Sequence, residues 1–127
     1  MSTAFPTDVV YTETHEWIRI EADGSLTVGI TDFGQEQLGS LVYVALPQIG
    51  AQLTGGADAG VVESNKTASD VHAPVSGTVL SVNEVLNETP EAINAAPYVQ
   101  WIFKLQPDAD FDAAIFLDAA AYCAMIG

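Results

Sequence analysis

The segment GVVESNKTASDVHAPVSG, residues 60–77, decides the fold because it predicts a complete hairpin with one amine at its tip. An apolar strand ends near Val62, a short polar turn carries Lys66, and a second strand leads to the turn residues Pro74 and Gly77. Lys66 stands out because the chain has only 3 Lys and Arg residues against 17 Asp and Glu. A single lysine on a hairpin tip suits an enzyme that must acylate one amine and no other.

Further short strands lie on both sides of this hairpin. Residues 16–21 alternate between apolar and polar side chains, Asp23-Gly24 gives a hairpin turn, and residues 26–30 return as the partner strand. Other predicted strands are residues 41–46, 77–82 and 98–105. Many short strands with Gly and Pro turns predict a mainly β protein, a sandwich or a barrel, with a few helices.

Two short helices are predicted between the strands. The first begins at Thr31 or Asp32, either of which can cap it, and ends at Gly39. The second begins at Thr89, with a proline at its first helical position, and runs to about Asn94.

A closing helix is predicted after the last strand, capped by Asp108 or Asp110. Its apolar stripe consists of Phe111, Ile115, Tyr122 and Ile126. Cys123 lies in this apolar segment and is expected to be a small buried side chain. Both tryptophans, Trp17 and Trp101, are expected in the core.

Composition limits the size of the fold and the class of partner. With 127 residues and 49% hydrophobic side chains, the chain is expected to form one domain over residues 1–127. A net charge of -14 argues against nucleic acid and against an anionic membrane surface, because both attract Lys and Arg. We expect a soluble monomer that is steered toward basic faces of protein partners.

The sequence also indicates a compartment. Cys123 is the one cysteine, so no intramolecular disulfide can form and a reducing compartment is compatible. Residues 1–10 have neither a basic nor an apolar region of the kind that starts a secretory signal. The longest apolar stretch, residues 119–126, is too short to span a bilayer. We therefore expect a cytoplasmic protein.

Other candidate sites are weaker than the hairpin. His15 and His72 form no metal-binding motif, and no phosphate-binding loop or nucleophile elbow is present. Lys104 lies in a predicted strand, from which its amine would project off a sheet face, and should stay unmodified. Carboxylates near Lys66, such as Glu63 and Asp70, favour a charged ammonium and do not activate it as a nucleophile. An outside ligase must therefore supply the activation.

A family resemblance runs through most of the chain in stretches that lie in the family's order. The matching stretches are residues 14–17, 28–31, 46–50, 62–70, 73–77, 82–83, 93–94 and 97–98. The most specific are Glu-Ser-x-Lys-x-x-Ser-Asp at residues 63–70 and Ala-Pro-x-Ser-Gly at residues 73–77. On these motifs the chain resembles the glycine cleavage system H proteins, the lipoyl carriers of that complex.

The resemblance implies a fold, a cofactor and site residues. The implied fold is a flattened lipoyl-domain β-sandwich, a barrel-sandwich hybrid, with a few short helices and a C-terminal helix. The implied cofactor is lipoate, amide-linked to Lys66. Glu63 and Gly77 correspond to residues by which the lipoate-attaching enzyme recognises the hairpin. A cleft for the loaded arm is implied at Thr14, Glu16 and Asp70.

The resemblance also implies partners and a carrier without catalysis of its own. The implied partners are glycine decarboxylase (P protein), the aminomethyltransferase (T protein), dihydrolipoamide dehydrogenase (L protein) and the lipoate-attaching enzyme. The chain departs from the usual pattern at Asn65, where Val is common, and in residues 98–101, where a longer stretch with Gly is common. The second departure puts the local loop in doubt and leaves the carrier function intact.

Four alternatives stay open at this point. A biotinyl domain usually has Met on both sides of its lysine, and this hairpin has none. A 2-oxoacid dehydrogenase lipoyl domain is shorter and lacks the stretch at residues 14–17. The third alternative is an H-like protein that relays lipoate to other enzymes. The fourth is a non-modified acidic interaction domain.

Overall fold

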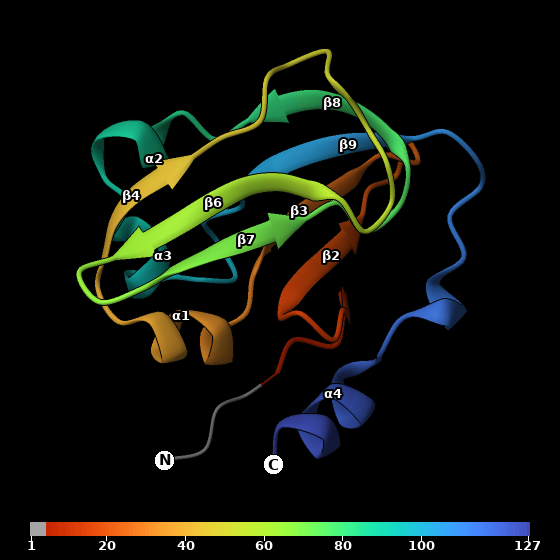
Figure 1. Cartoon of the computed structure of the whole chain (residues 1–127). Coiled ribbons are helices and arrows are strands. Elements are labelled where there is room, and N and C mark those ends of the chain that lie inside the picture. The colour runs from red at the N-terminus through yellow and green to blue at the C-terminus, as the bar shows by residue number, and fades with distance from the viewer. Residues whose placement is uncertain (1–4) are drawn as a thin grey trace.

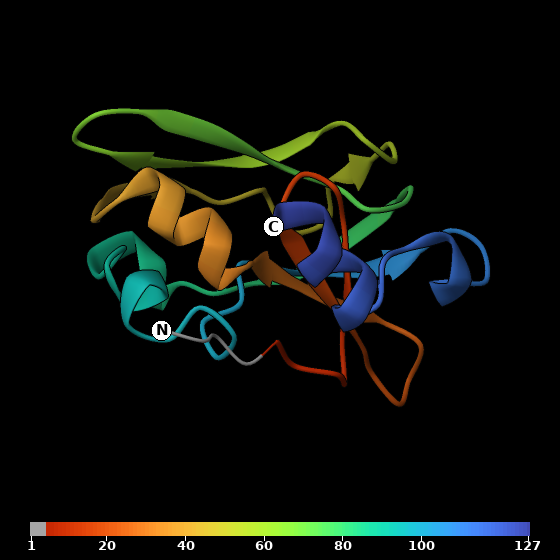
Figure 2. The ribbon, with the colours of Figure 1, turned by 90° about the horizontal axis from the view of Figure 1, so that it is seen from below.

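The computed structural model describes residues 5–127 and consists of two antiparallel sheets stacked in layers (Figures 1 and 2). The larger sheet has the strand order β1-β2-β3-β9-β8-β5. Its strands are β1 (Val10–Tyr11), β2 (Glu16–Ile20), β3 (Leu26–Ile30), β9 (Phe103–Pro107), β8 (Gly77–Val82) and β5 (Gln52–Leu53). The smaller sheet has the order β4-β6-β7, with β4 (Leu41–Ala45), β6 (Asp58–Ser64) and β7 (Ala68–His72). The mainly β sandwich predicted from the sequence is confirmed.

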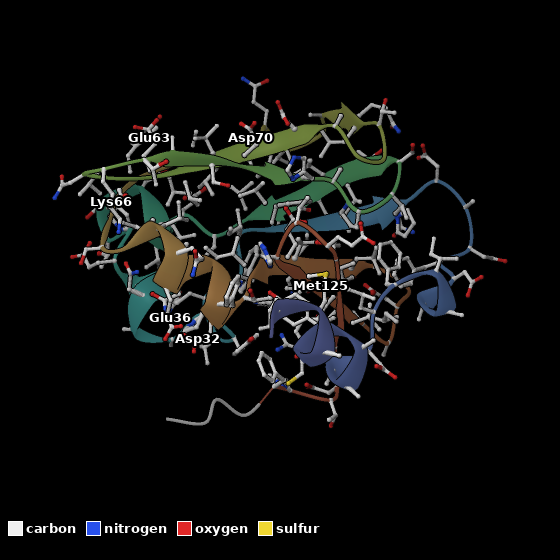
Figure 3. All side chains as sticks on the ribbon, turned by 60° about the horizontal axis from the view of Figure 1, so that its bottom comes forward. Asp32, Glu36, Glu63, Lys66, Asp70 and Met125 are labelled. Carbon is white, nitrogen blue, oxygen red and sulfur yellow. The ribbon has the colours of Figure 1, made fainter. Side chains whose placement is uncertain are left out.

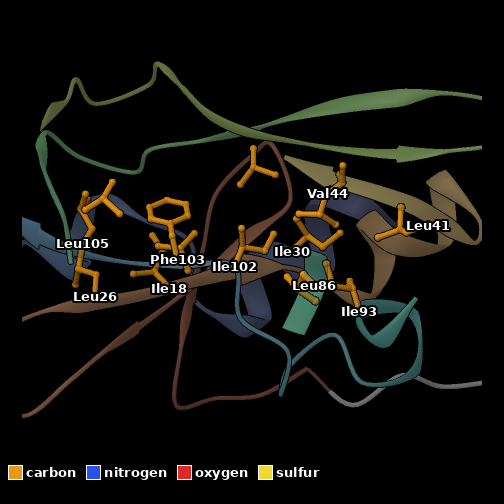
Figure 4. Packing of buried hydrophobic residues seen from close by; sticks show 14 of the residues in the cluster. Ile18, Leu26, Ile30, Leu41, Val44, Leu86, Ile93, Ile102, Phe103 and Leu105 are labelled. Carbon is orange, nitrogen blue, oxygen red and sulfur yellow. The ribbon is translucent and has the colours of Figure 1, made fainter. Parts of the chain in front are cut away.

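Apolar side chains from both sheets meet between the layers and form the main core (Figure 4). Ile18, Phe103 and Leu105 come from the larger sheet, while Val44 and Val62 come from the smaller one. All five are almost completely buried. Burial of such a side chain stabilises the fold by about 1.5–3 kcal/mol, so the alternating pattern along the strands accounts for the stacking.

Helix α1 (Asp32–Leu38) lies beside the small sheet, and its two ends are as predicted (Figure 2). The Thr31 hydroxyl accepts a hydrogen bond from the Gly34 N–H at 3.1 Å. Gly39 ends the helix with a φ of 88°, a conformation that glycine adopts without steric cost. The Asn94 side chain then fixes this end, because it donates to the Gly39 carbonyl and accepts from the Leu41 N–H.

The second predicted helix and the strand after it are wrong in detail. Two four-residue helices, α2 (Val85–Glu88) and α3 (Ala92–Ala95), replace the one helix, and Thr89 closes α2 instead of opening a helix. The expected strand at residues 98–105 begins only at Phe103, because the N–H groups of Val99 and Gln100 bond back to the Ala96 carbonyl in a turn. Trp101 is consequently half-buried.

The predicted closing helix is present, but its predicted start at Asp108 or Asp110 is wrong. The chain forms a short 3-10 turn, η1 (Ala113–Ile115), and then α4 (Ala119–Ile126), whose N-terminal cap is Asp118. Leu117 forms backbone hydrogen bonds with Tyr11, and this pairing interrupts any longer helix. Cys123 is exposed on α4, not buried as expected, since the side chain that α4 buries is its neighbour Tyr122. Within residues 5–127, no helix combines the length and the apolar character needed to cross a bilayer.

Candidate functional site

The Lys66 hairpin consists of β6, β7 and the turn that joins them, and its backbone is tightly defined. Glu63 pairs with Ala68 at the last rung of the ladder. The Ser64 N–H donates to the Thr67 carbonyl at 2.8 Å, and the Ser64 hydroxyl oxygen accepts from the N–H groups of Lys66 and Thr67. This turn leaves Lys66 exposed at the tip.

The Lys66 side chain extends from the tip toward the end of α1 (Figure 3). A Cβ atom placed on Gly39 would lie 3.4 Å from Cε and 3.8 Å from Nζ of Lys66, so this glycine leaves room for the lysine stem. Within residues 5–127, no carboxylate lies within ion-pair distance of Nζ. An exposed amine without a fixed partner is suited to acylation by an external enzyme.

A small hollow of about 100 Å³ lies between α1 and the hairpin, and we call it the α1 hollow. Asp70 and Ser69 of β7 form one wall, and Gly34 and Leu38 of α1 form another. Its remaining lining residues are Thr14, His15, Ile30, Gln37 and Val62. Ser69 follows Lys66 by three residues, so the α1 hollow starts close to the attachment point.

A larger hollow of about 470 Å³ adjoins it, and we call it the Glu16 pocket. Its polar lining is Thr12, Glu13, Thr14, Glu16 and His72. Its other lining residues are Tyr11, Gly56, Ala73, Pro74, Ile115, Phe116 and Leu117. Thr14 lines both hollows and marks the boundary between them.

Glu16 is an almost completely buried acid, with 1% of its surface exposed, and all its hydrogen bonds are made within the protein. Oε1 accepts from the hydroxyls of Thr12 at 2.5 Å and Thr14 at 2.6 Å. Oε2 lies 3.0 Å from both the backbone nitrogen and Nδ1 of His72. Four partners for one buried carboxylate offset much of its desolvation penalty.

A second polar network supports the loop that carries Thr14. The Tyr122 hydroxyl of α4 lies 2.7 Å from the Thr31 hydroxyl and 2.8 Å from Nδ1 of His15. His15 has a φ of 73°, which is uncommon for a residue with a side chain. Burial lowers the pKa of His15 and raises the pKa of Tyr122 to about 12, so both groups are neutral at pH 7. The last helix therefore holds the loop in position without adding charge.

The predicted site residues occupy three places. Thr14 and Glu16 are in hydrogen-bond contact, whereas Asp70 lines the α1 hollow, which it shares with Thr14. Glu63 is half-buried on β6, near Lys66. Gly77 begins β8 in the larger sheet, where a Cβ atom would overlap the Gln106 carbonyl oxygen. Packing against Gln106 therefore requires a glycine at this position of β8, independently of what the attaching enzyme recognises.

Sequence reasoning missed two residues of this site, Thr12 and His72. A signal existed for His72, because residues two apart in a strand share a face and Asp70 was already a candidate. Thr12 gave no signal, since its role depends on how the turn before β2 folds back on Glu16. Among the described residues, no group of three or more His, Cys, Asp or Glu side chains is placed to hold a metal ion.

Comparisons with known proteins agree over nearly the whole chain. The family model described as "Glycine cleavage H-protein" matches residues 9–126. The glycine cleavage system H protein 2 of Pseudomonas aeruginosa is 50% identical over 121 residues, which are 95% of this chain and 94% of that protein. The glycine cleavage system H protein of Paraburkholderia phytofirmans is 47% identical over 124 residues, 98% of each chain.

A solved structure is similar as well. The crystal structure of a glycine cleavage system H protein from Mycobacterium marinum matches with a TM-score of 0.88 at 40% identity, covering 97% of this chain and 99% of that one. This match confirms the expected lipoyl-domain-like sandwich with its few helices. The chain belongs to the glycine cleavage H-protein family.

Proposed function

We propose that this chain is a lipoyl carrier of the glycine cleavage system, with lipoate amide-linked to Lys66 and no catalysis of its own. The observation that carries the proposal is the exposed Lys66 amine at the hairpin tip. The site fits an acyl arm, because the amine has no ion-pair partner within residues 5–127 and the α1 hollow begins at Ser69, three residues along the chain.

Bound to Lys66, the lipoyl group supplies the disulfide–dithiol chemistry that carries the aminomethyl group of glycine from the P protein to the T protein, with reoxidation by the L protein. The chain's own residues attach, guide and shelter the arm. Ser69 is the lining residue of the α1 hollow that is nearest to Lys66 in the sequence. Three residues of extended chain span roughly 10 Å, a distance that a lipoyl-lysine arm can cover. Asp70, Thr14 and Glu16 follow along this path and offer oxygen atoms to a cationic amine.

An intact-mass measurement on protein from lipoate-replete cells tests this proposal. We expect a lipoyl-sized adduct, and peptide mapping should locate it on Lys66, because the other lysine, Lys104, lies in strand β9 of the larger sheet. Protein that stays unmodified in cells that lipoylate their other carriers would contradict the proposal and favour an acidic interaction domain.

Glu63→Ala is expected to slow lipoylation several-fold while the fold and the function of already lipoylated protein stay nearly unchanged. The reason is that Glu63 lies near the end of β6, three residues before the acceptor lysine, where an attaching enzyme must contact the hairpin. A lost charge-assisted hydrogen bond weakens that contact. The measurement is the initial lipoylation rate together with a thermal melt.

Glu36→Ala is the matched control for this variant, because Glu36 is an exposed carboxylate on α1 (Figure 3). It should be lipoylated at the wild-type rate. Equal slowing in both variants would show that the enzyme responds to overall negative charge and that Glu63 has no particular role.

A further inference from the structure

The two oxygen atoms of the Glu16 carboxylate are held in different ways. Oε2 is bound by the backbone N–H and the Nδ1 atom of His72, the last residue of β7. Oε1 is bound by two hydroxyl groups, those of Thr12 and Thr14. A backbone N–H cannot leave without moving the strand, whereas a hydroxyl can rotate and change from donor to acceptor. Oε1 is therefore the exchangeable edge of the carboxylate.

The position of Thr14 makes this edge accessible from both hollows. Thr14 is exposed, and it lines the α1 hollow as well as the Glu16 pocket. The Thr14 hydroxyl lies 2.6 Å from Oε1, so an ammonium group that reaches this hydroxyl through the α1 hollow comes close to Oε1. It can donate one hydrogen bond to each oxygen, once the Thr14 hydroxyl has turned its hydrogen away.

We propose that His72 is a positioning residue of the Glu16 pocket: it fixes Oε2, so that Oε1 and the Thr14 hydroxyl receive the primary ammonium group at the end of the loaded arm. This inference rests on the proposed carrier function. It adds a residue to the site and assigns separate tasks to the two carboxylate oxygens.

Three carboxylates surround His72, and only Glu16 lies within hydrogen-bond distance of its ring. The titratable groups that face the imidazole are Glu16 of β2 at Nδ1, Asp58 of β6 with Oδ1 3.8 Å from Nε2, and Glu13 in the pocket lining. The segment Ile115–Leu117 contributes only apolar side chains to that lining. Glu16 is therefore the carboxylate whose orientation depends on His72.

The first test uses the unmodified protein and does not depend on the arm. The chain has 2 histidines, so its imidazole nitrogen NMR spectrum contains two side chains, and a His15→Gln variant assigns them. Neutral His72 is expected to carry its proton on Nδ1, because only that tautomer donates to Oε2 of Glu16. In Glu16→Ala the proton should move to Nε2, the tautomer that is preferred in water. A proton on Nε2 in the wild-type protein would overturn the proposal.

The second test measures by mass spectrometry how fast methylamine-loaded, lipoylated protein loses its cargo. Removal of one donor to a charged group corresponds to roughly a tenfold change, so His72→Ala should lose the cargo about tenfold faster than the wild type. His72→Asn, whose amide can replace the Nδ1 donor, should restore the slow rate. Asp58→Asn is the matched control at the other ring nitrogen and should behave as the wild type does.

Each outcome of the second test decides between a positioning role and a structural one. Equal decay in wild type and His72→Ala, or decay of His72→Asn as fast as that of His72→Ala, would contradict the proposal. Failure of the carrier function itself would be seen separately, as protein without an adduct on Lys66, while the tautomer result would stand on its own.

Discussion

Lys66→Arg is expected to remove the lipoyl group completely, so that intact-mass spectra of the variant show only the unmodified chain. The guanidinium group stays protonated at all accessible pH values and cannot attack an activated acyl group. The positive charge at the hairpin tip is retained, and the thermal melt should not change, because Lys66 is exposed and its amine has no ion-pair partner within residues 5–127. Glycine cleavage in the reconstituted system should fall to background.

Lys104→Arg is the matched control for this result, since Lys104 is the only other lysine. Its ammonium lies over the Trp101 ring, 5.3 Å from the centroid, on strand β9. A cation–π contact accepts arginine as well as lysine, so this variant should be fully lipoylated and active. An adduct that persists in Lys66→Arg and disappears in Lys104→Arg would move the attachment site to β9 and refute the assignment.

Gly77→Ala is expected to destabilise the fold by about 3 kcal/mol or more. A Cβ atom on residue 77 would overlap the Gln106 carbonyl oxygen, and Gly77 pairs with both Leu53 and Pro107 in the larger sheet. The strands must separate locally to admit a methyl group, which disrupts the β8–β9 ladder. Urea unfolding monitored by circular dichroism gives the change in the free energy of unfolding.

Thr78→Ala is the control, because Thr78 is the next residue of β8 and hydrogen-bonds at the surface to Gln52. Its free energy of unfolding should change by less than about 1 kcal/mol. Lipoylation of Gly77→Ala, measured below its melting temperature, separates the two roles of the glycine. Slow lipoylation of folded protein supports recognition by the attaching enzyme. If Gly77→Ala is lipoylated at the wild-type rate, the role of Gly77 is limited to packing. If its free energy of unfolding equals that of the wild type, the predicted overlap is contradicted.

The parts of the fold that the sequence predicted correctly are local. The Lys66 hairpin is determined by neighbouring residues, and α1 is determined by the Thr31 cap at one end and by Gly39 at the other. The resemblance added the cofactor and the residues near it, which composition and spacing do not give. Capping, turns and alternation all act within a few residues, so a single sequence contains their signals.

The parts that were wrong depend on contacts between distant segments. The closing helix was placed too early because Leu117 pairs with Tyr11 at the other end of the chain. Cys123 was expected inside, but α4 buries Tyr122, which stacks on Tyr11 with ring centroids 4.7 Å apart. The sequence also contained no sign that Glu16 is buried, because its donors come from a turn and from β7. No local pattern contains such pairings.

The position of β9 has a consequence for the order in which the chain folds. This strand, near the end of the sequence, lies between β3 and β8 in the larger sheet, so that sheet closes only after residues 103–107 have been synthesised. β4, β6 and β7 are close in sequence and pair among themselves. Pairing between near neighbours is fast and pairing across the chain is slow. On the ribosome, the Lys66 hairpin is therefore expected to form before the sheet that supports it, and the attaching enzyme should encounter a ready acceptor on a partly folded nascent chain.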